Sequence, residues 1–182
     1  MQFRPLYLLV AAAPAFLAAL QGCATRSAAP EIDLVAIERI QQLKARYQRC
    51  IDTRDLPCLR DEVFAADTEL HWKGGDYDIH LIGWEQIDEF YTQAFTPTKF
   101  GMHHSHHPEI QVDGDTATGT WYLQDIFINL EDDTTLRGSA LYTDRYAKRN
   151  GEWRIVYSTY RRLWEEIEPR SKDIRLTVKP IE

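Results

Sequence analysis

Three tight-turn signals divide the second half of this chain: Asp113-Gly114-Asp115, Glu131-Asp132-Asp133 and Asn150-Gly151. Runs in which apolar and polar residues alternate lie on both sides of each signal. Asp-Gly and Asn-Gly between alternating runs are strong signals for β-hairpins, because these residues tolerate the positive φ angles of tight turns. The sequence therefore predicts four successive antiparallel strands over residues 102–164.

Helices are expected before this meander. Apolar residues recur at steps of three or four over residues 32–51, which indicates an amphipathic helix that Asp33 could cap. A second short helix is expected at 56–64, a strand at 68–72 and a third helix at 83–95. Helices followed by a meander predict an α+β domain, in which three N-terminal helices pack on one face of a curved antiparallel sheet.

The first residues are typical of a targeting segment. Arg4 precedes an apolar run, Leu6–Leu20, that is too short and too rich in alanine for a comfortable membrane span. The run leads into Leu-Gln-Gly-Cys, which resembles a bacterial lipobox that ends at Cys23, although its glutamine is an unusual occupant. An ordinary secretory signal with cleavage near residues 24–29 is the alternative.

We therefore expect residues 1–22 to be a lipoprotein signal peptide and residues 23–31 to hold the lipidated cysteine and a tether. Several attached acyl chains would anchor the protein stably in a membrane. Ala24 after the cysteine, rather than aspartate, resembles the outer-membrane sorting pattern of Gram-negative bacteria. The expected location is the cell envelope, with the protein anchored to the outer membrane and facing the periplasm.

Removal of the leader leaves about 150 residues, which fit one domain with one core. We expect this domain at residues 32–168, followed by a C-terminal extension at 169–182. The formal net charge is −7, and the sequence has no basic cluster. This charge argues against nucleic acid as a partner and against binding to acidic lipid through charge.

Cys50 and Cys58 remain in the mature chain. An exported protein reaches an oxidising compartment, where a disulfide between them is plausible. Closing this short loop would stabilise the fold by roughly 2.6 kcal/mol through the entropy of the unfolded chain. Two buried free thiols are the alternative, because Cys50 also falls on the apolar stripe of the first helix.

Three segments resemble one protein family in their order and spacing: residues 46–72, 108–125 and 141–155. They are similar to the SnoaL-like branch of the nuclear transport factor 2-like superfamily over residues 33–165, and closest in pattern to bile acid 7α-dehydratase and scytalone dehydratase. The resemblance implies a cone, in which a curved sheet with helices on its concave face surrounds an apolar pocket. It also implies a homodimer or homotrimer, for which Trp121 and Tyr122 offer aromatic surface. The superfamily holds dehydratases, isomerases, cyclases and ligand-binding members, so the fold alone does not determine the function.

Two candidate site residues lie on the first helix. Tyr47 is on its apolar stripe, where a buried phenol needs a hydrogen-bond partner. The resemblance implies that Tyr47 is a pocket tyrosine, and a core tyrosine with its hydroxyl at the rim is the alternative. Asp52 closes the helix, and the resemblance implies that it orients the catalytic histidine. An ordinary turn residue is the alternative, although a carboxylate at a helix C-terminus opposes the helix dipole.

Asp125 lies on the apolar side of an alternating strand, together with Leu123 and Phe127. An unpaired carboxylate in an apolar setting favours its protonated form, which suits a general acid or a hydrogen-bond donor. The alternative is an ion pair with Arg145 or Arg161.

Four of the six histidines lie within one five-residue stretch. The resemblance aligns His103 with the catalytic histidine, whereas strand parity with Ile110 favours His104. Pro108 lacks an amide hydrogen and often marks a β-bulge, which would shift the register by one residue. With a bulge His103 faces inward, and without one His104 does. We favour His103 and keep His104 in reserve.

Metal binding by the histidine cluster is another interpretation. Neighbouring residues on a strand face opposite ways, so only residues two apart could share an ion, and no third ligand is obvious. We therefore expect no metal, and we expect His106 and His107 to face solvent.

The candidate residues predict a dehydratase-like lyase or isomerase that needs no cofactor and acts on a small hydrophobic cyclic substrate, steroid-like or polyketide-like. His103 would remove a proton, Asp52 would orient His103, and Tyr47 and Asp125 would hydrogen-bond a carbonyl or protonate the leaving group. The alternative is a non-catalytic lipoprotein whose cone binds a hydrophobic ligand or a protein partner. Convergence of these side chains on one pocket would favour the enzyme.

Overall fold

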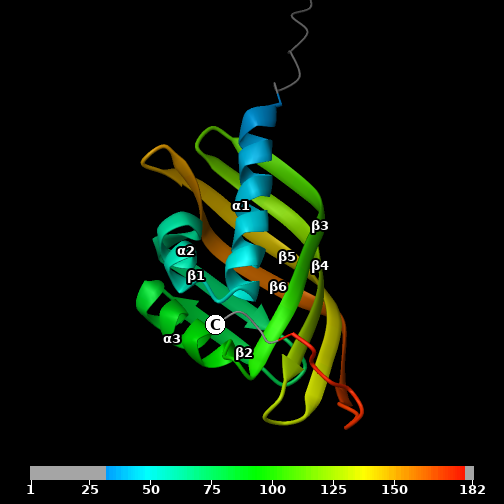
Figure 1. The fold of residues 1–182 in the computed structure, drawn as a ribbon. Coiled ribbons are helices and arrows are strands. Elements are labelled where there is room, and N and C mark those ends of the chain that lie inside the picture. Colours follow the sequence, from blue (N-terminus) through cyan, green and yellow to red (C-terminus); the bar gives the residue numbers. More distant parts are fainter. Residues whose placement is uncertain (1–31, 179–182) are drawn as a thin grey trace, which may run out of the picture. The chain divides into compact units, whose positions relative to one another are not determined.

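The computed structural model describes residues 32–178, in which helices precede long strands (Figure 1). The helical elements are α1 (Leu34–Asp52), α2 (Leu56–Cys58), the π-helical turn η1 (Leu59–Val63) and α3 (Trp84–Ala94). The strands are β1 (Phe64–Lys73), β2 (Asp78–Ile82), β3 (Lys99–Asp113), β4 (Thr116–Asn129), β5 (Thr134–Arg149) and β6 (Glu152–Pro169). This is the α+β architecture that the order of helix and turn signals predicts, with three helices and one curved sheet.

The six strands form one sheet in the order β2-β1-β6-β5-β4-β3. Strands β3 to β6 are a meander, joined by hairpins at the three predicted turns. One pair departs from the expected antiparallel sheet, because β1 lies parallel to β6. Turn signals determine direction only for strands that a tight turn joins. The chain from β1 to β6 instead passes through α3 and the whole meander, so packing decides how the two strands meet.

Two local elements differ from the expected pattern. Strand β2 is a short edge strand that pairs with β1, and its five residues were not predicted as a strand. All five are exposed or half-buried, so the apolar signal of a strand is weak there. The predicted second helix is present as α2 followed by η1, and it ends at Val63.

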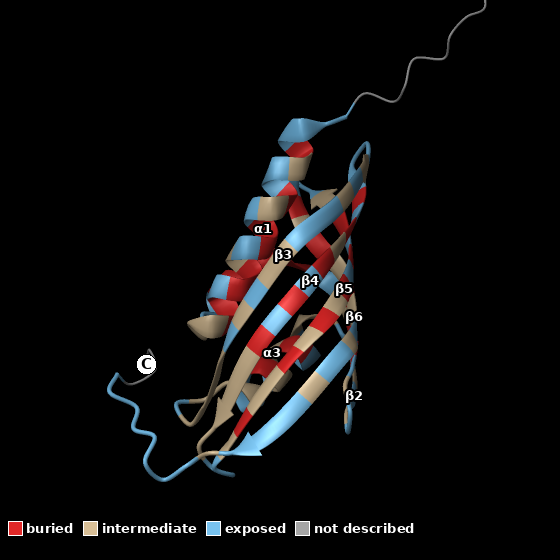
Figure 2. Ribbon diagram, turned by 90° about the vertical axis from the view of Figure 1, so that its right-hand side faces the viewer, coloured by how far each residue is buried: buried red, intermediate tan, exposed pale blue. Residues whose placement is uncertain are grey.

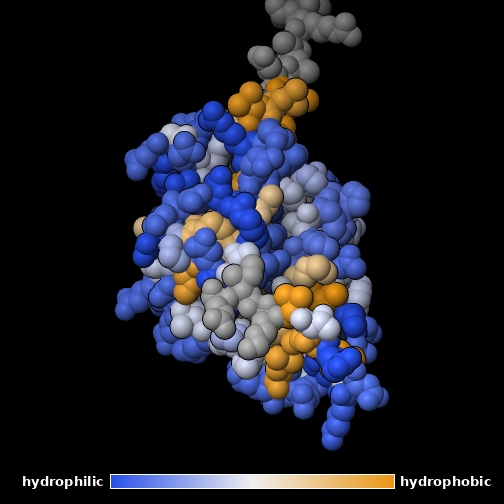
Figure 3. Space-filling model, in the orientation of Figure 1, coloured by the Kyte–Doolittle hydropathy of each residue, from blue (hydrophilic) through white to orange (hydrophobic). Residues whose placement is uncertain are grey.

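The first helix, α1, packs against the sheet through its apolar stripe. Asp33 caps it, since Oδ1 of Asp33 accepts a hydrogen bond of 2.9 Å from the backbone nitrogen of Ala36. Figure 2 shows buried positions along the side of α1 that faces the strands. The buried residues of α1 include Ile40, Leu43 and Tyr47. The exposed large apolar side chains of α1, Leu34 and Val35, lie in its first turn and form a hydrophobic area at that end of the helix (Figure 3).

Burial alternates along β4, and its odd-numbered residues from Ala117 to Asp125 face the interior. Trp121 is therefore buried, and its Nε1 donates a hydrogen bond of 2.9 Å to the hydroxyl of Tyr146. The expectation that Trp121 adds to an exposed interface is wrong. Tyr122, on the opposite parity, is 40% exposed.

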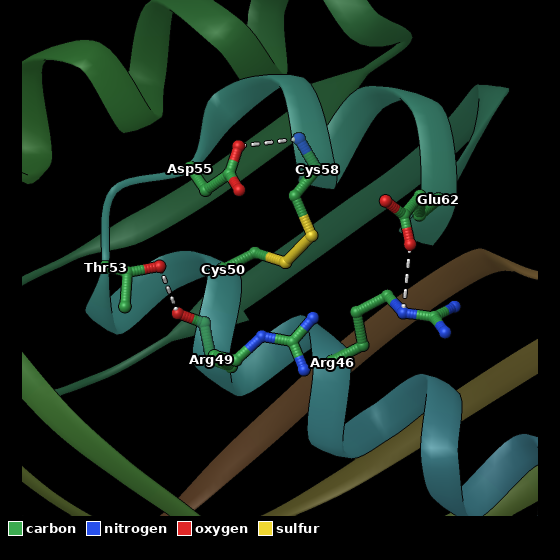
Figure 4. Close-up of a disulfide and its surroundings, with 7 residues drawn as sticks. All are labelled: Arg46, Arg49, Cys50, Thr53, Asp55, Cys58 and Glu62. Carbon is green, nitrogen blue, oxygen red and sulfur yellow. Dashed lines mark hydrogen bonds and ion pairs between the residues drawn. A yellow bond between two sulfur atoms is a disulfide. The ribbon is translucent and has the colours of Figure 1, made fainter.

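Cys50 and Cys58 are joined by a disulfide, and the alternative of two free thiols is not what the structure shows (Figure 4). The bridge connects the last turn of α1 to α2, across the short link between the two helices.

The predicted signal peptide, the lipidated Cys23 and the tether lie outside the described residues, so lipid anchoring at the outer membrane stays a prediction. Within residues 32–178, none of the helices combines the length and the hydropathy needed to cross a membrane. Beyond β6, residues 170–178 continue without helix or strand.

Candidate active site

A cavity of about 180 Å³ lies between the helices and the inner face of the sheet. Most of its wall is apolar and is contributed by residues such as Trp72, Phe90, Tyr91, Phe95, Leu123 and Phe127. A few polar side chains converge on it: Tyr47, Tyr77, His103, Asp125, Tyr160 and Arg162. An apolar wall with a small number of convergent polar groups is the usual form of a small-molecule site. Three of the predicted residues thus share one cavity, and Asp52 lies directly behind the histidine.

Asp52 binds His103 through both carboxylate oxygens. Its Oδ1 lies 2.6 Å from Nδ1 of His103, and its Oδ2 accepts a hydrogen bond of 3.1 Å from the backbone nitrogen of the same residue. Asp52 is the last residue of α1 and His103 lies in β3, so the pair connects helix to strand. Because a carboxylate only accepts, Nδ1 carries the proton and Nε2 is left as the basic nitrogen. The imidazole is 11% exposed and the carboxylate 26%.

A β-bulge decides which histidine faces the cavity. The β3–β4 register shifts between His106 and Glu109, and His107 adopts a positive φ of 49°. His103 therefore faces the cavity although it has the opposite sequence parity to the half-buried Ile110. His104 is exposed and lines a groove on the other side of the Asp52–His103 pair. This is the orientation expected for a bulge near Pro108.

Tyr47 lies in the cavity wall with 1% of its surface exposed, and its hydroxyl is 3.1 Å from that of Tyr91. Burial, followed by the nearby Tyr142 and Tyr91, raises the pKa of Tyr47 well above its ordinary value. Tyr47 therefore stays protonated at neutral pH and can act as a hydrogen-bond donor.

Asp125 is not an unpaired carboxylate. Its two oxygens accept hydrogen bonds of 2.7 and 2.9 Å from Nη1 and Nη2 of Arg162, in a bidentate pair. The expectation of a lone, protonated Asp125 is contradicted by this pairing, because an ionised carboxylate held by a guanidinium accepts hydrogen bonds and has no proton to give. A second carboxylate, Glu165, lies 2.8 Å from Nε of Arg162.

The sequence predicts an ion pair as the alternative for Asp125, with Arg145 or Arg161 as the partner. The structure confirms an ion pair but corrects the partner, which is Arg162. The β5–β6 register shifts between Ser139 and Ala140, which are paired with Trp164 and Arg162. This irregularity places Arg162 opposite the buried Ala140 and so on the inner face.

The guanidinium of Arg162 begins a chain of hydrogen bonds that the sequence did not reveal. Its Nε donates to the hydroxyl of Tyr77 at 3.1 Å, and that hydroxyl lies 2.5 Å from the hydroxyl of Tyr160. Two hydroxyls that bond to each other use one hydrogen between them, which leaves the second phenolic hydrogen to donate elsewhere. Burial, followed by Tyr142 and Tyr77, raises the pKa of Tyr160, which keeps it protonated. The pair therefore offers a donor at the cavity wall. Its sequence signal is the shared parity of Tyr160 and Arg162 on the last strand.

Residues 33–159 match the SnoaL-like domain family. This chain belongs to that family. Its fold is also similar to several solved structures. Hexachlorocyclohexane dehydrochlorinase LinA-type3 from Novosphingobium barchaimii aligns with a TM-score of 0.66 at 18% identity, over 80% of this chain and 96% of the other. A protein provisionally assigned as a scytalone dehydratase, from Novosphingobium aromaticivorans, aligns with a TM-score of 0.66 at 16% identity, over 80% and 92% of the chains.

A third structure, a variant of a protein of unknown function from Mycobacterium tuberculosis, aligns with a TM-score of 0.60 at 29% identity, over 70% of this chain and 72% of the other. The identities to the first two structures are low, so those likenesses establish the cone-shaped nuclear transport factor 2-like fold and not the reaction.

Behind the cavity wall, this SnoaL-like domain holds a buried ion pair that the sequence did not predict. Nζ of Lys44 lies 2.7 Å from Oδ2 of Asp144, with 1% and 0% of the two side chains exposed. The ammonium also lies 3.6 Å from the ring centroid of Tyr142, a cavity residue. Burial lowers the pKa of Lys44, although Asp144 opposes the shift. Lys44 and Asp144 therefore do not line the cavity, but Lys44 packs against Tyr142, which does.

The rest of the histidine cluster lies away from the cavity. Nδ1 of His106 is 2.6 Å from Nδ1 of His107, and the ring of His106 stacks on Tyr122. Neighbouring histidines were expected to face opposite ways, and the bulge at His107 removes that alternation. Across residues 32–178, no three side chains of histidine, cysteine, aspartate or glutamate gather in an arrangement that could hold a metal ion.

Proposed function

We propose that this SnoaL-like domain is a cofactor-independent lyase that eliminates water from a small hydrophobic cyclic substrate bearing a hydroxyl group β to a carbonyl. The observation that carries the proposal is the double hydrogen bond from Asp52 to His103 beside an apolar cavity. A carboxylate that holds one nitrogen of an imidazole leaves the other as a general base, and it stabilises the imidazolium that forms.

In the proposed reaction, Nε2 of His103 takes the proton from the carbon next to the carbonyl. The electron pair of that C–H bond forms the C=C bond, the C–O bond to the hydroxyl breaks, and the imidazolium returns its proton to the departing oxygen as water. Asp52 holds the imidazolium throughout. The chain from Arg162 through Tyr77 to Tyr160 supplies a donor for the carbonyl oxygen, where negative charge develops. Asp125 then has a positioning role, because it orients Arg162.

The competing hypothesis is a ligand-binding protein without catalysis. Such a protein needs the apolar cavity but has no need for an aspartate–histidine pair beside it. The convergence of Tyr47, His103 and the Arg162 chain on one cavity supports the enzyme.

The test is turnover of a panel of polycyclic β-hydroxy ketones, including hydroxylated 3-keto-steroids, followed by the absorbance of the conjugated enone that elimination produces. We expect His103→Gln and Asp52→Asn each to reduce kcat/KM by about 10²–10⁴, the usual contribution of general acid–base catalysis. His104→Gln is the matched control, because it changes an exposed histidine on the same strand and should leave turnover intact.

Equal turnover by His103→Gln and the parent would show that the assigned base is wrong. Saturable binding of the same ketones with no enone from the parent protein would favour the ligand-binding hypothesis.

A further inference from the structure

Asp52 lies at the C-terminal end of α1, where the helix itself does little to keep a catalytic carboxylate in position. It is the last helical residue, and the helix is closed by Thr53, whose backbone nitrogen and hydroxyl both donate to the carbonyl of Arg49. The last turn of a helix is the part most prone to fraying, because its carbonyls lack intrahelical partners. A negative charge there is also repelled by the helix dipole. The position of Asp52 therefore has to be secured by contacts outside the helix.

The Cys50–Cys58 disulfide provides such a contact, since it ties the turn that carries Asp52 to α2 (Figure 4). Cys50 lies two residues before Asp52 and is 1% exposed, so its side chain is held in the core. The backbone closes the same loop, because the nitrogen of Asp55 donates to the carbonyl of Cys50 at 2.8 Å. Oδ1 of Asp55 in turn accepts a hydrogen bond of 3.0 Å from the nitrogen of Cys58, which caps α2. Asp52 thus lies inside a short loop that is closed at both ends.

We propose that the Cys50–Cys58 disulfide is a positioning element for Asp52, so that the aspartate–histidine pair is assembled only in the oxidised protein. The bridge lies outside the cavity wall, while the α1 residues that do line the cavity, Tyr47 and Ile51, are held by core packing. Loss of the bridge therefore loosens the carboxylate without removing the binding surface. The inference rests on the proposed function for its kinetic consequence, but its structural consequence can be measured without a substrate.

Reduction by a dithiol breaks the S–S bond, adds two electrons and two protons to give two thiols, and oxidises the dithiol to its own disulfide. The same state is obtained permanently in the full-length double variant Cys50→Ala/Cys58→Ala. The structural readout is the proton NMR signal of the Nδ1–H of His103, which a hydrogen bond of 2.6 Å to a carboxylate moves far downfield. Its assignment comes from its loss in Asp52→Asn.

We expect this signal in the oxidised parent and expect it to broaden or vanish in the double variant. For a ketone that the oxidised parent converts, the kcat of the double variant should be lower on the order of 10²-fold, which is the effect of a misplaced catalytic group. Its KM should stay within about a factor of two of the parent value. Ile40→Val is the control, since it loosens a buried contact nearer the start of α1 and leaves the bridge in place. It should keep both the signal and kcat.

A double variant that retains the downfield signal overturns the proposal, and so does one with unchanged kcat. If the double variant does not fold, the parent treated with a dithiol and checked by mass for uptake of two hydrogens provides the same comparison. If the oxidised parent shows the signal but turns over no ketone, the proposed function fails while the signal still decides whether the bridge positions Asp52.

Discussion

His103 faces the cavity because one residue, His107, takes a left-handed backbone conformation and interrupts the alternation of β3. Bulges of this kind often lie next to active sites, where they redirect a side chain. Its partner Asp52 comes from the end of a helix rather than from the sheet. The candidate site therefore depends on two irregular positions, a bulge and a helix terminus, and not on the regular part of either element.

At the residue scale, Asp125→Asn tests the role of the cavity ion pair. The substitution leaves the guanidinium of Arg162, which is 13% exposed, without its bidentate partner. Breaking a buried pair from one side costs about 3–5 kcal/mol, and we expect the lower end because Glu165 stays beside Arg162. Urea unfolding measures this loss. The control is Asp61→Asn, which breaks an exposed pair with Arg60 and should leave the midpoint of urea unfolding nearly unchanged. Equal destabilisation by Asp125→Asn and Asp61→Asn would contradict the role of Asp125 as the buried partner of Arg162.

At the scale of the elements, α1 carries Tyr47 and Asp52 to the cavity, and the buried Lys44 holds this helix against β5. Lys44 reaches Asp144, whose carboxylate also accepts hydrogen bonds from Tyr146 and Ser158. The helix is thus fixed near its middle by an ion pair and at its end by the disulfide.

Lys44→Met should destabilise the protein by about 3–5 kcal/mol, because it leaves the charge of Asp144 buried without a cation. Chemical unfolding followed by circular dichroism checks this value. Lys73→Met, which breaks an exposed pair with Asp78, is the control and should have little effect. The double variant Lys44→Met/Asp144→Asn should recover part of the loss, and a double variant less stable than Lys44→Met would argue against the pair as the cause.

At the scale of the whole molecule, the core contains several phenols whose pKa is raised by burial. They are Tyr47, Tyr91, Tyr142, Tyr146 and Tyr160. A phenol with a higher pKa in the folded state has no effect on stability while both states are protonated. Above the ordinary value near 10, the unfolded state loses protons first, so folding loses about 1.4 kcal/mol per pH unit for each such group.

We therefore expect stability to fall steeply above pH of about 10, with phenolate absorbance appearing together with loss of the circular dichroism signal. Tyr91→Phe should make this fall less steep. Full ionisation of all nine tyrosines in a protein that remains folded would contradict the expectation.

Self-association also belongs to the whole molecule. With Trp121 buried, the apolar side chains left exposed on the strands include Met102, Tyr122, Leu163, Trp164 and Ile167. Exposed apolar groups on a sheet favour an interface with a second copy. Sedimentation of residues 32–182 at micromolar concentration should show a dimer or trimer, and Trp164→Lys should weaken it. A clean monomer at these concentrations would be incompatible with the prediction.

The sequence by itself determined the hairpin meander, the capped first helix, the pairing of Cys50 with Cys58 as one of two options, and the short list that contains His103 and Asp52. The meander and the capped helix are encoded locally, in turn chemistry and in the period of apolar residues, whereas the roles of His103 and Asp52 are what the family resemblance implies. Only the tertiary structure decided that β1 runs parallel to β6, that Arg162 rather than its neighbour binds Asp125, and that Lys44 is buried against Asp144. In each case the partner lies on an element that is distant in the sequence, and tertiary packing, which no local pattern encodes, brings the two together. For Arg162 the choice also depends on strand register, because a shift of one residue exchanges the two faces of a strand.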